Sequence, residues 1–395
     1  MSIKLSDHFG YKKLIKFTLP TVAMMIVTSI YSVVDGFFVS NFAGKTPFAA
    51  INLIMPVLMI LGTVGVMFGT GGTALGAKTY GEGNKEKANS YFSLLVYTAF
   101  LLGIIFAVLG FVFIRPIAVL LGAEGALLEN CVLYSRIILL ALPLYILQMM
   151  FQSFFVAAEK PNLGLIVTIS SGATNMILDA VLVISLPQEY KLAGAAAATA
   201  ISQTVGGIIP LFYFFRKNSS FLRLGKTQFN GKAIIKACAN GSSEFMSNIS
   251  MSVVGMLYNS QLMKFAGENG IAAYGVMMYV SMIFAAVFVG YSVGTAPVVS
   301  YHFGAGNSPE LKGLLKKSLI IIAVFGVGMV AAAELTAAPL SKFFVGYDKE
   351  LYELTASGFR IFAISFLFMG FGIFISGFFT ALNDGATSAI VSFLR

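Results

Sequence analysis

Two carboxylates stand inside stretches of sequence that are otherwise almost free of charge. Asp35 is followed by Gly-Phe-Phe-Val, and Asp179 lies eight residues before Pro187 in a second apolar run. An ionisable group costs free energy in a nonpolar medium, so a group in such a place is a functional candidate. The polar residues spaced around these two carboxylates indicate which chemistry they can do.

Asn175 lies four residues before Asp179, which puts both side chains on one helix face. Thr199 lies eight residues beyond Lys191 in the following apolar run. Counted from the outer ends of their runs at about 1.5 Å per residue, Asp35 and these three groups lie at a similar depth, roughly 10–12 Å. Two carboxylates, an amide oxygen and a hydroxyl suit a small hard cation. The carboxylates could instead share a proton, because two like charges held close cannot both stay ionised. Each group could also be satisfied within a helix bundle.

Glu244 is a third acidic candidate, at the start of another apolar run. It lies eight residues beyond Lys236, so it belongs to the inner half and not to the level of Asp35. Two interpretations stay open. Glu244 is a second coupling or substrate residue, or it is a hydrated carboxylate near a helix N-terminus, where the helix dipole favours it.

Two arginines and one proline complete the candidate set. Arg136 and Arg360 stand near the outer ends of their apolar runs, which is typical of long cationic side chains that reach the lipid headgroups. Pro20 interrupts the first run and is a candidate hinge.

The amino-acid composition indicates which medium surrounds the segments that carry these residues. Hydrophobic residues make up 57% of the 395 and charged residues 11%, whereas a soluble domain carries about 25% charged residues. A bilayer therefore replaces water around most of the chain. The net charge of +9 would suit nucleic acid, but the basic residues fall between apolar runs, so membrane topology explains them and we expect no nucleic-acid partner.

A span takes about 20 apolar residues. The runs of low charge predict ten full spans near 17–41, 47–77, 91–114, 131–157, 163–186, 193–215, 236–263, 271–301, 314–333 and 356–382, with an eleventh beginning at Ala386. Seventeen Lys and Arg fall in the segments on the side of the N-terminus and six on the other. Because basic residues concentrate in cytoplasmic loops, the N-terminus is expected in the cytoplasm.

The second half of the sequence repeats the first. A shift of 223 residues aligns Phe42-Ala43-Gly44 with Phe265-Ala266-Gly267 and Pro116 with Pro339. The same shift aligns Gly81-x-Gly83-Asn84 with Gly304-x-Gly306-Asn307. Farther along, a shift of 224 aligns Arg136 with Arg360. Six spans per repeat make the halves parallel, related by an axis along the membrane normal. We therefore expect an all-α polytopic membrane protein with two six-helix lobes, at 1–216 and 236–395, joined by a cytoplasmic loop at 217–235. A twelfth helix is expected beyond residue 395.

Known catalytic signatures are missing from the sequence. It contains no Walker sequence, no Cys/His metal spacing and no Gly-x-Ser-x-Gly elbow. We therefore expect no enzyme and no cofactor, and an ion gradient as the energy source. One charge moved through the membrane potential yields about 2.3 kcal/mol per 100 mV.

The sequence resembles the multidrug and toxic compound extrusion (MATE) family, of the bacterial multidrug-efflux kind. The resemblance rests on Leu19-Pro20, Tyr31-x-x-x-Asp35, Gly81-x-Gly83-Asn84 with its copy, and Asn175-x-x-x-Asp179. It implies two lobes around a V-shaped cavity, and export of cationic drugs coupled to Na⁺ or H⁺ entry. By motif, the family's cation site falls on Asp35, Asn175 and Asp179, with Thr199 as the best candidate for its hydroxyl. Pro20 corresponds to a proline where the first helix can bend, and Glu244 to an acidic residue that some members use.

The resemblance also sets the expected surroundings and the alternatives. We expect a monomer in the bacterial cytoplasmic (inner) membrane, with small organic cations and membrane lipids as partners. A flippase for lipids or lipid-linked oligosaccharides, from the wider superfamily, is the main alternative. Such proteins tend to need a basic central cavity, and few basic residues lie inside the spans here. An intramembrane enzyme would need a nucleophile or a metal pair at one depth, and the sequence offers neither.

Overall fold

The computed structural model describes residues 3–346 and 348–394, and throughout these residues the regular structure is helical. The helices are α1 (Tyr11–Phe38), α2 (Lys45–Gly81), α3 (Lys85–Leu120), α4 (Gly125–Ala157), α5 (Pro161–Ser185), α6 (Lys191–Phe215), α7 (Gly231–Gly241), α8 (Ser243–Gly304), α9 (Ser308–Val345), α10 (Lys349–Ala363), α11 (Ser365–Ala381) and α12 (Gly385–Leu394). Within the described residues, eight helices are long and apolar enough to cross a membrane, or nine if α10 and α11 form one span.

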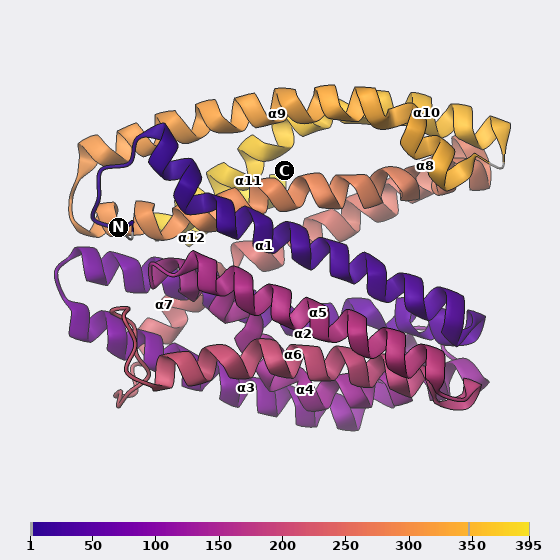
Figure 1. Cartoon of the computed structure of the whole chain (residues 1–395), viewed down its shortest axis with the longest axis horizontal. Coiled ribbons are helices and arrows are strands. Elements are labelled where there is room, and N and C mark those ends of the chain that lie inside the picture. Colours follow the sequence, from indigo (N-terminus) through magenta and orange to yellow (C-terminus); the bar gives the residue numbers. More distant parts are fainter. Residues whose placement is uncertain (1–2, 347, 395) are drawn as a thin grey trace.

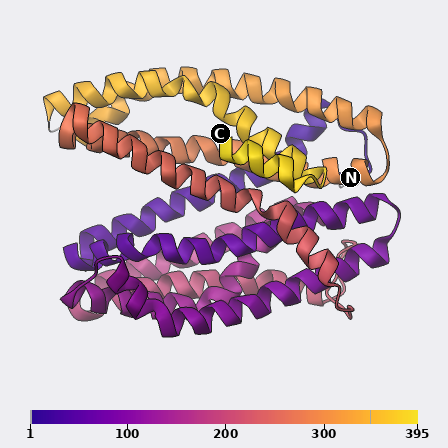
Figure 2. The ribbon, with the colours of Figure 1, turned by 180° about the vertical axis from the view of Figure 1, so that it is seen from behind.

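The helices form two bundles that lie side by side (Figure 1). We call α2–α6 the N-lobe and α8–α12 the C-lobe. Each lobe has a hydrophobic core of its own, with Phe92 and Phe151 in the first and Phe366 and Phe374 in the second. The view from behind shows the same division, with α1 running between the lobes (Figure 2). The expected all-α architecture with two lobes is confirmed.

The internal repeat has a structural cause at its glycine positions. Gly44 ends the first transmembrane segment with φ 106°, and its repeat partner Gly267 interrupts α8 with φ 59°. Only glycine adopts this left-handed region readily. Gly267 therefore divides the 62 residues of α8 into two helical segments, in the same way that Gly44 separates α1 from α2.

The Gly-x-Gly-Asn motif forms the next turn in both lobes. Gly83 and Gly306 have φ of 86° and 67°. The asparagine that follows caps the next helix: Asn84 Oδ1 accepts a hydrogen bond from the amide of Lys87 at 3.0 Å, and Asn307 Oδ1 accepts one from Glu310 at 3.3 Å. The motif is therefore a turn followed by an N-cap.

Two of the expected spans differ from the structure. The run 356–382 is divided between α10 and α11, which meet at an angle of 46°. There the amides of Ile364 and Leu367 bond three residues back, to Ile361 and Ile364, so the α-helical ladder is interrupted. The run 236–263 begins in α7, breaks near Ser242 and continues in α8. Several of its side chains, including Phe245 and Asn248, lie outside the described residues.

Helix α1 connects the two lobes. Leu5, Phe9, Leu14 and Phe17 are buried in the core of the C-lobe. Farther along, α1 packs on the N-lobe helix α5, where Gly172 lies against the ring of Tyr31. The division of the chain into lobes at 217–235 stays a prediction, because the residues around the start of α1 contribute to the second core.

The lobes touch through the repeated glycines themselves. A Cβ atom on Gly81 would overlap the carbonyl oxygen of Tyr301, and one on Gly304 would overlap the carbonyl oxygen of Lys78. The ends of α2 and α8 therefore cross in a backbone contact that is the same from both sides, as expected at a pseudo-two-fold axis.

Candidate functional site

The four residues predicted to form a cation site come from three helices. Asp35 is in the last turns of α1, Asn175 and Asp179 are one turn apart on α5, and Thr199 is on α6. The structure brings them together: the side chains of Asp179, Asn175 and Thr199 all lie within hydrogen-bonding reach of the Asp35 carboxyl group. These are the four residues that similar depth along three separate runs had singled out, and their binding of a cation stays a prediction.

The site is buried, and its oxygen atoms lack donors. Asp179 is fully buried and Asn175 is 2% exposed. Among the described residues, no hydrogen bond of good geometry reaches Oδ1 of Asp35, either carboxyl oxygen of Asp179, Oδ1 of Asn175 or Oγ1 of Thr199. Buried polar atoms in proteins are nearly always hydrogen-bonded, so a cluster of such atoms needs an explanation.

The donor set fits a small cation or a shared proton. Carboxylates accept but do not donate when ionised, so Asp35 and Asp179 cannot satisfy one another unless one of them is protonated or a cation lies between them. The ligand atoms that these four side chains offer are oxygens, which suit a hard ion such as Na⁺. Within the described part of the chain, no cluster of three or more His, Cys, Asp or Glu could hold a metal ion.

Tyr134 is a neighbour of the site that the sequence did not reveal. It lies on α4, is 1% exposed, and its hydroxyl lies within reach of Thr199 and near both carboxyl groups. A phenol can donate one hydrogen bond to an oxygen cluster. A single tyrosine in an apolar run is equally typical of a packed core, so no pattern in the sequence identified it.

A second layer of polar groups lies one helical turn from the site. Gln148 Nε2 donates to Ser171 Oγ at 3.2 Å, and Ser171 Oγ donates to the carbonyl of Ser202 at 2.7 Å. Ser202 Oγ in turn donates to the carbonyl of Thr199. Gly206 allows this arrangement, because a Cβ there would overlap the Gln148 amide. The second layer ties α4, α5 and α6 together directly beside the cation site.

Glu244 lies apart from this cluster, in the first turn of α8. Its neighbour Ser243 is 3.3 Å from the hydroxyl of Thr380, which is 2.7 Å from that of Ser388. A cluster of hydroxyl groups from α8, α11 and α12 therefore lies at the start of α8 in the C-lobe. As the sequence indicated, Glu244 is not at the level of Asp35, and both interpretations of it stay open.

Pro20 lies inside α1, and the helix continues through it. Two turns of α1 around it pack on glycines of α8: Gly290 lies against Thr21 and Val22, and Gly294 lies against Thr18. This contact holds α1 against the C-lobe at the level of the proline. The hinge role of Pro20 stays a prediction.

Comparison with known proteins identifies the family. The family model MatE matches residues 20–181 and 245–395, which is most of the chain. The chain belongs to the MatE family. The two matched segments correspond to the two repeats, and the MATE resemblance read from the sequence is confirmed.

Relatives and solved structures agree with this assignment. The multidrug export protein MepA of Staphylococcus haemolyticus (strain JCSC1435) is 27% identical over 97% of this chain and 84% of that protein. The crystal structure of a MATE protein in complex with MaL6 has a TM-score of 0.92 at 22% identity, over 98% of this chain and 87% of that one. An outward-facing structure of a multidrug resistance MATE family transporter of the MOP superfamily has a TM-score of 0.91 at 22% identity, over 98% and 86% of the two chains. At these identities the structures establish the MATE fold.

Proposed function

We propose that this MATE chain exports small organic compounds, chiefly amphipathic cations, in exchange for Na⁺ or H⁺. The family, the name of the relative MepA and the two parallel repeats support export. The single observation that supports ion coupling is the buried cluster of Asp35, Asn175, Asp179 and Thr199, whose oxygen atoms lack donors.

The coupling ion acts in this proposal by neutralising the carboxyl pair. With Asp35 and Asp179 both ionised, repulsion between them opposes close packing of α1 on α5. A proton or Na⁺ removes that repulsion and allows α1 to approach α5. Binding of the ion therefore favours one arrangement of α1 over another, which is the differential affinity that a conformational change requires.

Helix α1 is the proposed link from the ion to the rest of the protein. Its last turns carry Asp35, whereas its first turns are buried in the C-lobe core and lie against Gly290 and Gly294. A shift or bend of α1 therefore changes its contacts with both lobes. Pro20 lies within the turns that pack on Gly290 and Gly294, between the buried Phe17 and Asp35, and its missing backbone donor lowers the cost of a bend there. This is the physical basis for the proposed hinge.

The proposed orientation follows the distribution of basic residues. The N-terminal segment and the connection from α6 to α7 lie in the cytoplasm of a bacterial cell, and the protein spans the inner membrane many times. Asp35 then lies nearer the outer face. In this orientation the inward gradient of H⁺ or Na⁺ reaches the site from outside.

Proteoliposomes loaded with a fluorescent organic cation test the coupling. Asp35→Asn keeps the size of the side chain but removes the charge, so gradient-driven transport should fall at least tenfold. Arg360→Gln, on the lipid-facing side of the C-lobe, is the control and should keep transport near the wild-type rate. Unchanged transport by Asp35→Asn would exclude Asp35 from coupling, and translocation of lipid headgroups in place of the cation would favour a flippase.

A further inference from the structure

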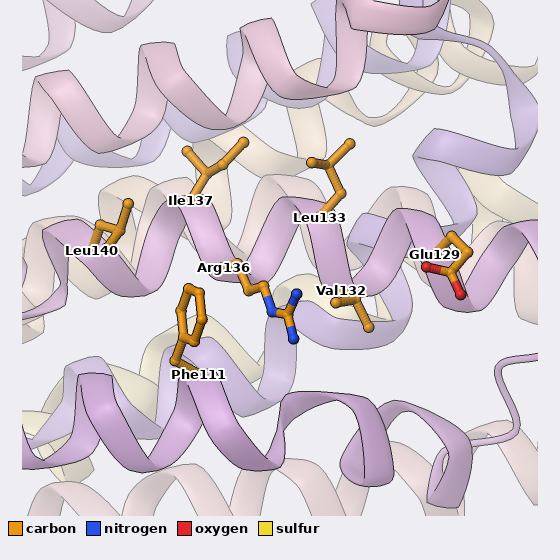
Figure 3. A pocket seen from close by; sticks show the side chains of 7 residues that line it. All are labelled: Phe111, Glu129, Val132, Leu133, Arg136, Ile137 and Leu140. Atoms are coloured by element: carbon orange, nitrogen blue, oxygen red, sulfur yellow. The ribbon is translucent and has the colours of Figure 1, made fainter.

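Arg136 occupies an unusual place on the outside of the N-lobe. Its guanidinium group lies over the ring of Phe111 on the neighbouring helix α3, with Cζ 4.8 Å from the ring centroid (Figure 3). Both side chains are exposed on the outer surface of the N-lobe. A cation–π contact is attractive but leaves the positive charge uncompensated.

The C-lobe has a different arrangement at the same place. The repeat aligns Arg136 with Arg360, and it aligns Phe111 with Glu334. Arg360 Nε lies 3.8 Å from Glu334 Oε2, so the C-lobe arginine has an acidic partner on α9. In the N-lobe the aromatic ring stands where that carboxylate would be. Among the described residues, no carboxylate forms an ion pair with Arg136; Glu129, two turns away on α4, pairs with Arg115 at 2.6 Å.

A hollow surrounds the unpaired guanidinium. It has a volume of about 260 Å³ and is lined by Phe111, Glu129 and Arg136 together with the apolar side chains of α4. Of these, Leu133 is 41% and Leu140 is 74% exposed. Arg136 extends from α4 toward α3 and ends beside the Phe111 ring, whereas Leu133 and Leu140 extend from the other edge of α4 and line the same hollow (Figure 3). The charged groups at this end of the hollow are Arg115, Glu129 and Arg136, and their net charge is one positive charge.

We propose that Arg136 binds the phosphodiester group of a phospholipid whose acyl chains lie along Leu133 and Leu140. A phosphodiester carries one negative charge, which matches the charge of the hollow, and guanidinium is the cationic group best suited to phosphate. The exposed leucines favour a lipid over a free anion, because a free anion gains nothing from an apolar wall. The lipid belongs to the leaflet that meets the α3–α4 turn, the outer leaflet in the orientation proposed above.

Native mass spectrometry with added phosphatidylglycerol tests this proposal. Arg136→Gln should weaken the tightest lipid-binding event about tenfold, as expected for the loss of a charge-assisted hydrogen bond. Phe111→Glu keeps the arginine but gives it the carboxylate that Glu334 provides in the C-lobe, so it should weaken binding similarly. Arg360→Gln is the matched control and should bind as the wild type does. Melting temperatures of the variants establish that each one is folded.

Three outcomes would overturn the proposal. The first is unchanged binding in both Arg136→Gln and Phe111→Glu, and the second is an equal loss in Arg360→Gln. The third is displacement of phosphatidylglycerol by soluble glycerol phosphate at the same concentration, which would indicate a free-anion site without a role for the apolar wall. None of these outcomes bears on the ion coupling at Asp35.

Discussion

The backbone amide of Phe9 donates a hydrogen bond to Glu310 Oε1 at 2.9 Å, which binds the segment before α1 to the start of α9. The other oxygen of Glu310 is 2.6 Å from His8 Nδ1. On the opposite lobe, the amide of Leu5 donates to Glu159 at 2.7 Å. The segment 3–10 therefore connects both lobes at the end where Gly81 and Gly304 cross. A separation of the two lobes at this end would break one of these two attachments.

Removal of the Glu310 carboxylate should release this segment from the C-lobe. Glu310→Ala removes the acceptor for Phe9 and the partner of His8, and hydrogen bonds to a charged group contribute about 1.5–3 kcal/mol. Amide exchange at Phe9 should then accelerate tenfold or more, as measured by hydrogen exchange with mass spectrometry. Glu310→Gln keeps an acceptor oxygen and should show a smaller effect. Equal protection in the wild type and Glu310→Ala would contradict this account.

The contribution of Glu159 to the stability of the folded state should depend on pH. Burial raises the pKa of the Glu159 carboxyl group above its usual value of 4.5, although the amide of Leu5 partly opposes this. A raised pKa means that the folded state binds the proton more tightly. The stability that Glu159 contributes is therefore fully present below pH 4.5 and is lost as the pH rises through the folded-state pKa.

Melting temperatures of wild type and Glu159→Gln across pH 4 to 7 check this sign. The glutamine mimics the protonated form, so the two proteins should melt alike at the acid end and diverge as the pH rises, with the wild type less stable. A difference that grows toward acid pH would mean that the ionised carboxylate stabilises the fold.

The contact between α2 and α8 at Gly81 and Gly304 should tolerate no side chain. Gly81→Val places atoms against the Tyr301 carbonyl, and overpacking of this kind costs roughly 1–3 kcal/mol. We expect a lower melting temperature and slower transport, and the same from Gly304→Val. Gly76→Ala, on the same helix with free space around its Cα, is the control and should be neutral or slightly stabilising. Equal melting temperatures for all three variants would contradict a close contact at this crossing.

The hydroxyl group of Thr199 should tune affinity for the coupling ion. Thr199→Val keeps the shape but removes one oxygen ligand, so the half-saturating ion concentration for transport should rise about tenfold, whereas Thr199→Ser should stay within about twofold. The measurement is the initial transport rate against Na⁺ concentration or pH. If the valine and serine variants behave alike, the hydroxyl group takes no part in binding.

The sequence predicted the architecture because the bilayer imposes strong rules. Long apolar runs, the distribution of Lys and Arg, and the glycine repeat led to two all-helical lobes. Gly44 and Gly267 show why the repeat was reliable: each glycine occupies a backbone conformation that other residues avoid, so the type of residue reflects the geometry directly.

What the sequence missed depends on contacts between distant residues. The break between α10 and α11 contains no proline, and nothing in Ile364 or Ser365 indicates it. The place of Tyr134 beside Thr199 depends on how α4 packs on α6. The difference between Arg136 and Arg360 could have been predicted from the sequence, because the repeat aligns Phe111 with Glu334. The structure was needed to show that Phe111 and Glu334 lie next to these arginines.

In the proposed mechanism, ion entry through the Asp35–Asp179 pair drives export. The most direct measurement follows efflux of a fluorescent organic cation from proteoliposomes under an imposed pH gradient or an imposed Na⁺ gradient, with the entering ion recorded at the same time. We expect that one gradient drives efflux together with entry of its ion, and that Asp35→Asn and Asp179→Asn each abolish both movements. Cation efflux at the wild-type rate with no ion entry, or ion-coupled efflux that survives in both variants, would contradict it.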